Sequence, residues 1–222
     1  MIGLGKLALK IKLLALAVVV LLIIVSLETF MLTTQESNPV RVACVGDSIT
    51  EGTGYTVELW RLLGSNYVVG DFGVGGARVL LSSDNAYLFT TAFQVAKQFQ
   101  PDIVIVMLGT NDAESNLNQT NQEFISDYTT LVTEIKSFAS NPDVWIVKPP
   151  PVFPNDSDLD PEYFSQNILP SINQVANQMN LHLIDVYTPL SSHEEYFLED
   201  GVHPNVEGAQ SIASVIYNAL SS

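Results

Sequence analysis

The chain has 222 residues, of which 47% are hydrophobic, and its 24 acidic residues against nine basic ones give a formal net charge of −15. This size and apolar content suit one domain of about 180 residues behind an N-terminal extension. The negative charge argues against nucleic-acid binding and against docking on an anionic lipid surface, because both partners carry phosphate groups. A single cysteine, Cys44, excludes an intrachain disulfide and a zinc site with paired cysteines.

Residues 1–33 differ in composition from the rest of the chain. Three lysines (Lys6, Lys10 and Lys12) precede an apolar block, Leu13 to Leu27, that only Ser26 interrupts. A helix over this block covers about 22 Å, less than a hydrocarbon core of about 30 Å, although flanking lysines extend the reach. No small-x-small cleavage motif follows it.

We therefore expect residues 1–33 to be an uncleaved signal anchor that places the domain outside the cytoplasm, because the flanking positive charge stays inside. A cleaved secretory signal, with a secreted domain, is the alternative. Residues 34–39 are polar and predict a short tether, and the domain is expected to cover residues 40–222.

Strands and helices are predicted to alternate through this domain. Apolar runs closed by glycine or proline predict five strands, near residues 40–45, 67–72, 103–108, 144–147 and 181–186. Apolar periodicity predicts helices between them: Val57, Trp60, Leu62 and Leu63 indicate one that ends at Gly64, and others are expected near 89–99, 120–138, 161–179 and 206–220. Thr120 and Glu123 form a capping box, followed by an apolar stripe of Phe124, Tyr128, Leu131, Ile135 and Phe138.

This alternation predicts an α/β fold, a three-layer α/β/α sandwich on a five-stranded parallel sheet. Five strands suit the flavodoxin-like order 2-1-3-4-5, whose switch point lies between the first and third strands. Ser48 follows the first strand and Gly109–Asp112 follows the third, so both loops are expected to flank one crevice. Open α/β sheets bind their ligands at such a crevice.

Four short blocks at strand ends carry reactive or polar groups: Gly46–Thr50, Gly73–Gly76, Gly109–Asp112 and Asp200–Asn205. Ser48 is the candidate nucleophile. A serine needs a base, and the base needs an acceptor that holds its tautomer; Asp200 and His203 supply both from one turn. An oxyanion would find donors in the backbone N–H groups of Ser48 and Gly76 and in the side-chain amide of Asn111.

Each block also has an ordinary structural explanation. Ser48 could cap the next helix, Asp200 and Gly201 could form a simple turn, and Asn111 with Asp112 could cap a helix. His182 is expected to be structural and His193 exposed. The segment GVGGAR lacks the last glycine of GxGxxG and no GxxxxGK is present, so we expect no nucleotide cofactor, and no metal ion either.

Taken together, the four blocks resemble the SGNH (GDSL-type) hydrolases, in the order of that family and from Val42 to the last helix. The resemblance implies that Ser48 is the nucleophile, that His203 is the base oriented by Asp200, and that Ser48, Gly76 and Asn111 form the oxyanion hole. Ile49 replaces the leucine of the family's name. Arg78 stands where a small polar residue is expected, and either meets an acidic substrate or forms a surface salt bridge.

Within that family, GDSITEGTGY and PDIVIVMLGTND are similar to the carbohydrate O-acetylesterase branch. The 149–165 loop mixes prolines with Asp156, Asp158 and Asp160, which favours a small acyl group on a polar leaving group over a lipid. Three aromatic residues (Phe153, Tyr163 and Tyr196) either stack on a sugar or pack in the fold. We expect a serine esterase that releases acetate from glycans. A lysophospholipase or thioesterase of the same family, and a non-catalytic glycan-binding relative, are the alternatives.

Overall fold

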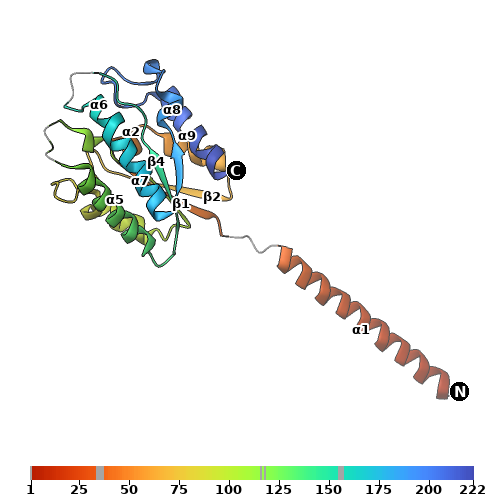
Figure 1. Ribbon diagram of the computed structural model, residues 1–222. Helices are drawn as coiled ribbons and strands as arrows, with labels where there is room; N and C mark the ends of the chain where they lie inside the picture. The colour runs from red at the N-terminus through yellow and green to blue at the C-terminus, as the bar shows by residue number, and fades with distance from the viewer. Residues whose placement is uncertain (1, 34–37, 116, 118, 155–157) are drawn as a thin grey trace. The chain divides into compact units, whose positions relative to one another are not determined.

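The computed structural model describes residues 2–33, 38–115, 117, 119–154 and 158–222 (Figure 1). The chain divides into two units, Met1–Asn38 and Pro39–Ser222. In the first unit the structure describes helix α1, Ile2–Thr33. Of the helices in the described ranges, none combines the length and the apolar content that a membrane crossing requires. The structure gives no support to the expected membrane anchor, which stays a prediction.

The second unit is built on one sheet of five parallel strands in the order β2-β1-β3-β4-β5, as predicted. The strands are β1 (Val40–Gly46), β2 (Tyr67–Gly73), β3 (Ile103–Met107), β4 (Asp143–Lys148) and β5 (His182–Asp185). In β1 and β3 every residue after the first one or two is buried, because helices cover both faces of the sheet. The apolar runs in the sequence are a consequence of this two-sided cover.

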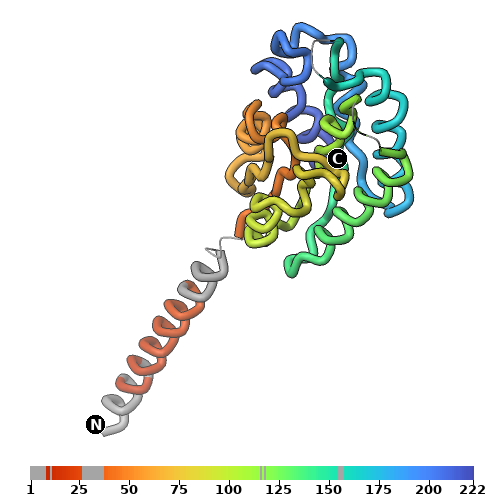
Figure 2. Tube along the Cα trace, turned by 90° about the vertical axis from the view of Figure 1, so that its left-hand side faces the viewer, coloured from red at the N-terminus to blue at the C-terminus, as the bar shows by residue number. Residues whose placement is uncertain are grey.

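The helices of this unit are α2 (Ser48–Gly52), α3 (Tyr55–Leu63), α4 (Thr91–Gln98), α5 (Asn121–Lys136), α6 (Pro161–Tyr163), α7 (Leu169–Met179), α8 (Tyr187–Leu190) and α9 (Val206–Leu220). Short turns of 3-10 helix lie at η1 (Tyr87–Phe89), η2 (Asn111–Ala113) and η4 (Glu194–Tyr196). Figure 2 shows α5 (green) and α7 (cyan) side by side, and buried residues of both helices belong to one apolar cluster.

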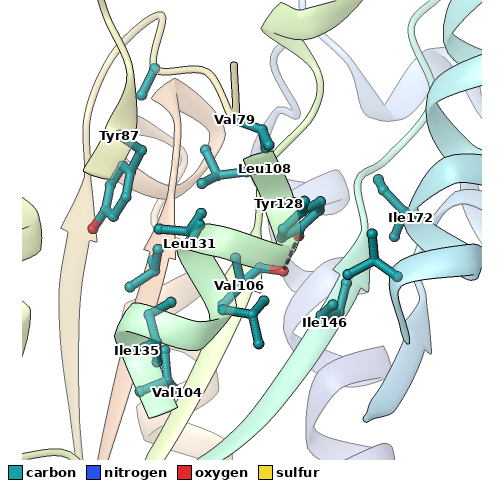
Figure 3. Packing of buried hydrophobic residues seen from close by; sticks show 14 of the residues in the cluster. Val79, Tyr87, Val104, Val106, Leu108, Tyr128, Leu131, Ile135, Ile146 and Ile172 are labelled. Atoms are coloured by element: carbon teal, nitrogen blue, oxygen red, sulfur yellow. Dashed lines mark hydrogen bonds between the residues drawn. The ribbon is translucent and has the colours of Figure 1, made fainter. Parts of the chain in front are cut away.

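Two apolar clusters separate the three layers. Side chains alternate across β3, so Val104 and Val106 join the cluster beneath α4, α5 and α7, whereas Ile105 and Met107 join the cluster beneath α3 and α9. Figure 3 shows the first cluster, in which the Tyr128 hydroxyl donates to the Val106 carbonyl at 3.5 Å. The predicted sandwich is therefore confirmed.

Helix α5 follows the sequence pattern closely. The Thr120 hydroxyl accepts from the Glu123 N–H and the Glu123 carboxylate accepts from the Thr120 N–H, which confirms the capping box. All five residues of the predicted stripe are buried, although α5 ends at Lys136 and Phe138 lies just beyond it. The last helix, α9, matches its predicted bounds and buries the expected face, Ala209, Ile212, Ala213 and Ile216.

Two details differ from expectation. The helix predicted over 161–179 is broken by a π turn, η3 (Phe164–Ile168), in which the Leu169 N–H reaches back to the Phe164 carbonyl. Pro170 causes the irregularity, because it has no N–H to continue the α-helical ladder. In α3, Val57 and Trp60 are 69% and 45% exposed, and the helix instead packs through Tyr55 and Leu59.

Candidate active site

Ser48 is the first residue of α2, which begins two positions after the last residue of β1. The preceding residue, Asp47, caps the helix: its carboxylate accepts from the Ile49 N–H at 2.9 Å. Ser48 is therefore not the cap, and its hydroxyl is left for another partner. The Ser48 Oγ lies 2.8 Å from Nε2 of His203, although 155 positions separate the two residues.

The opposite nitrogen of the His203 ring, Nδ1, lies 2.8 Å from Oδ2 of Asp200. The other oxygen, Oδ1, accepts from the backbone N–H groups of Val202 and His203, each at 2.9 Å. Burial raises the pKa of Asp200, but these hydrogen bonds and the imidazole outweigh burial and hold the pKa below its usual value. Because an ionised carboxylate only accepts, Nδ1 carries the proton and Nε2 is free to accept from the Ser48 hydroxyl.

The glycine loop Gly73–Gly76 packs directly against the segment that carries Ser48. A Cβ added to Gly73 would lie 2.2 Å from the Glu51 nitrogen and 2.8 Å from the Asp47 carbonyl oxygen, so only glycine fits there. The Val74 N–H donates to the Gly46 carbonyl at 3.1 Å. Gly76 has a φ of 70°, a conformation that glycine adopts without strain.

Asn111 opens η2, immediately after β3 and the Gly109–Thr110 turn. Its side-chain Nδ2 donates to the carbonyl of Ala77 at 3.1 Å, which uses one of its two N–H groups and leaves the other free to turn toward a ligand. This bond joins the loop after β3 to the glycine loop after β2. The two loops therefore meet beside Ser48, as the strand order predicts.

A cavity of about 360 Å³ opens over this site, and its walls are formed by Ser48, Asn111, Glu114, Asp158, Leu159, Asp200, Val202 and His203. Four of the five predicted site residues thus line one cavity. The fifth, Gly76, is not among the lining residues and adjoins Ala77, which binds Asn111. Asp158 belongs to the predicted acidic loop, whereas Asp156 lies outside the described residues.

Arg78 is bound within the protein and is not free to meet a substrate. Its guanidinium pairs with the Glu114 carboxylate, donates through Nε to the Asn111 carbonyl at 3.1 Å, and through Nη1 to the Ser83 hydroxyl at 3.3 Å. Of the two roles expected for Arg78, the ion pair is present, and it is mostly buried, with the Arg78 side chain 19% exposed.

The burial of two carboxyl groups, on Asp47 beside Ser48 and on Asp112 beside Asn111, was not anticipated from the sequence. Burial raises the pKa of Asp47 to about 7 despite the hydrogen bond from the Ile49 N–H, and it raises the pKa of Asp112 to about 6. Asp112 accepts from the backbone N–H groups of Val79 and Leu80, each at 3.0 Å. Both residues look like loop positions in the sequence, and only the tertiary structure reveals their burial.

The other predicted side chains lie away from the cavity walls. His182 stacks on Trp145 with the ring centres 4.0 Å apart, and is exposed. His193 is half-buried, binds Glu195 and stacks on Tyr196. None of Phe153, Tyr163 and Tyr196 lines the cavity, and Phe153 packs on Phe197. Within the described ranges, no group of three or more His, Cys, Asp or Glu side chains could hold a metal ion.

Comparison with known proteins finds relatives among esterases and structures with the same fold. An acetylxylan esterase from Xylanibacter ruminicola is 28% identical over 210 residues, which are 83% of this chain and 44% of that protein, so the chain spans under half the length of this relative. The inhibitor-bound M. smegmatis aryl esterase has a TM-score of 0.68 at 18% identity, covering 82% of this chain and 98% of that one.

Est24, a carbohydrate acetylesterase from Sinorhizobium meliloti, has a TM-score of 0.63 at 22% identity, with the same coverage of 82% and 98%. At these identities the two structures show that the fold is shared. The model of the GDSL-like lipase/acylhydrolase family matches residues 44–210, which contain the serine, the glycine loop, the asparagine and the Asp–His turn. The chain belongs to this family of esterases and acylhydrolases.

Proposed function

We propose that this esterase hydrolyses small acyl esters, above all acetyl esters of carbohydrates, through a Ser48–His203–Asp200 triad. The observation that carries the proposal is the pair of 2.8 Å contacts through which the His203 ring joins the Ser48 hydroxyl to the Asp200 carboxylate. This arrangement turns a weakly nucleophilic hydroxyl into one that can lose its proton as it attacks.

In the proposed reaction the Ser48 Oγ attacks the ester carbonyl carbon while Nε2 of His203 takes the hydroxyl proton. The carbonyl oxygen becomes an oxyanion, which accepts from the N–H groups of Ser48 and Gly76 and from the Asn111 amide. His203 returns the proton to the leaving alcohol as the C–O bond breaks. A water molecule, deprotonated by the same imidazole, then hydrolyses the acyl-serine and restores the hydroxyl. We propose no metal or organic cofactor for these steps.

The cavity supports an uncharged alcohol group in the substrate. Glu114 and Asp158 line the wall, and no lysine or arginine is among the eight lining residues. Arg78, whose guanidinium donates to the Asn111 carbonyl, is paired with Glu114. Carboxylates accept hydrogen bonds from sugar hydroxyls and repel anionic groups, so we propose neutral acetylated sugars over acetylated uronates or sialosides. The relative that acts as an acetylxylan esterase supports the same class.

We also propose that the domain works outside the cytoplasm. The support is the cluster of Lys6, Lys10 and Lys12 ahead of the apolar block Leu13–Leu27. Cell fractionation of the full chain tests this: recovery in the cytoplasmic fraction alone would contradict it, whereas membrane and secreted fractions separate an uncleaved anchor from a cleaved signal.

Turnover by a Ser48→Ala variant tests the catalytic proposal. We expect kcat for p-nitrophenyl acetate to fall at least about 10³-fold, because the nucleophile is lost. Ser191→Ala is the matched control: this exposed serine bonds only locally, to the Thr188 carbonyl, and its replacement should leave kcat unchanged. Wild-type turnover in Ser48→Ala would rule the mechanism out.

The acyl group is tested separately, with p-nitrophenyl acetate, butyrate and octanoate and with acetylated xylan. We expect the highest kcat/KM for the acetyl esters, because chain-length preference reports the shape of the acyl site. A preference for octanoate would favour a lysophospholipase or thioesterase and would contradict the acetyl assignment while leaving the triad intact.

A further inference from the structure

The peptide unit between Gly75 and Gly76 is held by a side chain from another segment. Nδ2 of Asn85 donates to the Gly75 carbonyl at 3.0 Å, reaching back ten positions along the chain. The peptide unit before it is also held, since the Gly75 N–H donates to the Glu51 carboxylate at 2.7 Å. Glu51 belongs to α2, the helix that begins with Ser48.

The bond from Asn85 determines where the Gly76 N–H points. The carbonyl of Gly75 and the N–H of Gly76 belong to one trans peptide, so they point in opposite directions. Holding the carbonyl against Asn85 therefore turns the N–H away from Asn85. No described residue accepts a hydrogen bond from this N–H. The free donor is available for a ligand.

A second effect acts on the strength of that donor. A hydrogen bond to a peptide carbonyl polarises the peptide and makes its N–H a stronger donor. The left-handed φ of 70° at Gly76 maintains this orientation of the peptide, and a Cβ at this position would also lie 3.1 Å from the Asn85 amide. The Asn85 amide thus restricts both the orientation of the Gly75–Gly76 peptide and the size of the residue at position 76.

Asn85 is itself fixed from both sides. Its N–H donates to the Ser83 hydroxyl at 3.1 Å, and its carbonyl accepts from the Arg78 N–H at 3.0 Å. The Arg78 guanidinium in turn holds the Asn111 carbonyl. One connected set of bonds therefore links Asn85 to both loops that carry the proposed oxyanion donors.

We infer that Asn85 is a positioning residue of the oxyanion hole, which holds the Gly75 carbonyl so that the Gly76 N–H faces the tetrahedral intermediate, with Glu51 fixing the preceding peptide from the helix of the nucleophile. This inference rests on the proposed esterase mechanism. Asn85 does not line the cavity, so its effect is exerted through Gly76 and falls on the transition state.

The test is steady-state kinetics of Asn85→Ala and Asn85→Asp in the full chain with p-nitrophenyl acetate. Asp keeps the size of the side chain but cannot donate when ionised. Loss of a direct oxyanion donor costs about 10²–10³-fold in kcat, so we expect a loss of about 10–100-fold here, with KM changed less than about twofold. Asn177→Ala, at an exposed position of α7, is the matched control and should retain kcat.

Glu51 provides an internal check. Glu51→Gln keeps an oxygen that accepts from Gly75 and should retain most of the kcat that Glu51→Ala loses. Wild-type kcat in folded Asn85→Asp, or equal changes in kcat and KM in both Asn85 variants, would overturn the inference. That result is distinct from failure of the mechanism itself, in which Ser48→Ala would remain active.

Discussion

Asp200 accepts three hydrogen bonds with its two carboxylate oxygens, two from the backbone and one from the His203 ring. The backbone bonds fix the carboxylate, and the carboxylate fixes the tautomer of the imidazole. Replacement by asparagine keeps the size of the group but allows an N–H to face Nδ1. The ring would then carry its proton on Nε2, and Nε2 could not accept the proton of the Ser48 hydroxyl.

We therefore expect Asp200→Asn to lower kcat by about 10²–10⁴-fold while the protein stays folded. Kinetics with p-nitrophenyl acetate measure the loss, and the thermal midpoint serves as the folding control. A change of less than about threefold in kcat would show that Asp200 does not set the tautomer.

The buried carboxyl of Asp47 makes stability depend on pH. Its pKa is raised to about 7 by burial, whereas an unfolded chain has an aspartate pKa of about 3.9. Between these values the folded chain keeps a proton that the unfolded chain has lost. The stabilising contribution is therefore complete below about pH 4 and is lost as the pH rises through about 7.

Asp47→Asn removes this titration and keeps an oxygen to cap α2. Relative to the variant, the wild type should lose on the order of 1 kcal/mol or more of unfolding free energy between about pH 4 and pH 8. Urea denaturation of both proteins across this range measures the difference. A difference that does not change with pH would contradict the raised pKa.

At the scale of elements, helices and strands are predicted best from the sequence where the local pattern of residues agrees with the packing in the folded structure. The β3 run is apolar on both faces because helices cover both, and Thr120 with Glu123 caps α5 through strictly local bonds. The π turn η3 was not predictable from periodicity alone. It depends on how the backbone rearranges around the hydrogen bond that Pro170, which has no N–H, cannot donate.

In the candidate site, too, local motifs could be predicted from the sequence, whereas contacts between distant segments could not. That Ser48, Asp200 and His203 lie close together could be predicted, because each stands in a short motif at a strand or helix end. The bond from Asn85 to Gly75 could not, because a polar residue in a loop has no periodicity that reveals its partner. The burial of Asp47 and Asp112 likewise depends on segments distant in the sequence.

The capping box predicts a local effect on stability. Thr120→Ala removes the acceptor for the Glu123 N–H and should lower the unfolding free energy by about 1 kcal/mol without changing kcat. Thr130→Ala is the matched control, because this threonine lies inside α5 and bonds only to the Ser126 carbonyl. Equal destabilisation by both substitutions would show that the cap contributes nothing specific.

At the scale of the whole molecule, all residues of the candidate site lie in the unit Pro39–Ser222, which has its own sheet and apolar clusters. A chain restricted to residues 39–222 should therefore fold and keep kcat and KM for p-nitrophenyl acetate within about twofold of the full chain. Circular dichroism and kinetics measure this. An inactive or unfolded product would show that residues 1–38 contribute to the domain.

The central claim is that the Ser48 hydroxyl is made nucleophilic by His203. Labelling of the full chain with a fluorophosphonate, followed by mass spectrometry of its peptides, tests this most directly, because the reagent bonds to an activated serine oxygen. We predict a single adduct on the peptide that contains Ser48, and labelling at least about 10²-fold slower in His203→Ala. An adduct on a different residue, or an equal rate in His203→Ala, would contradict the account.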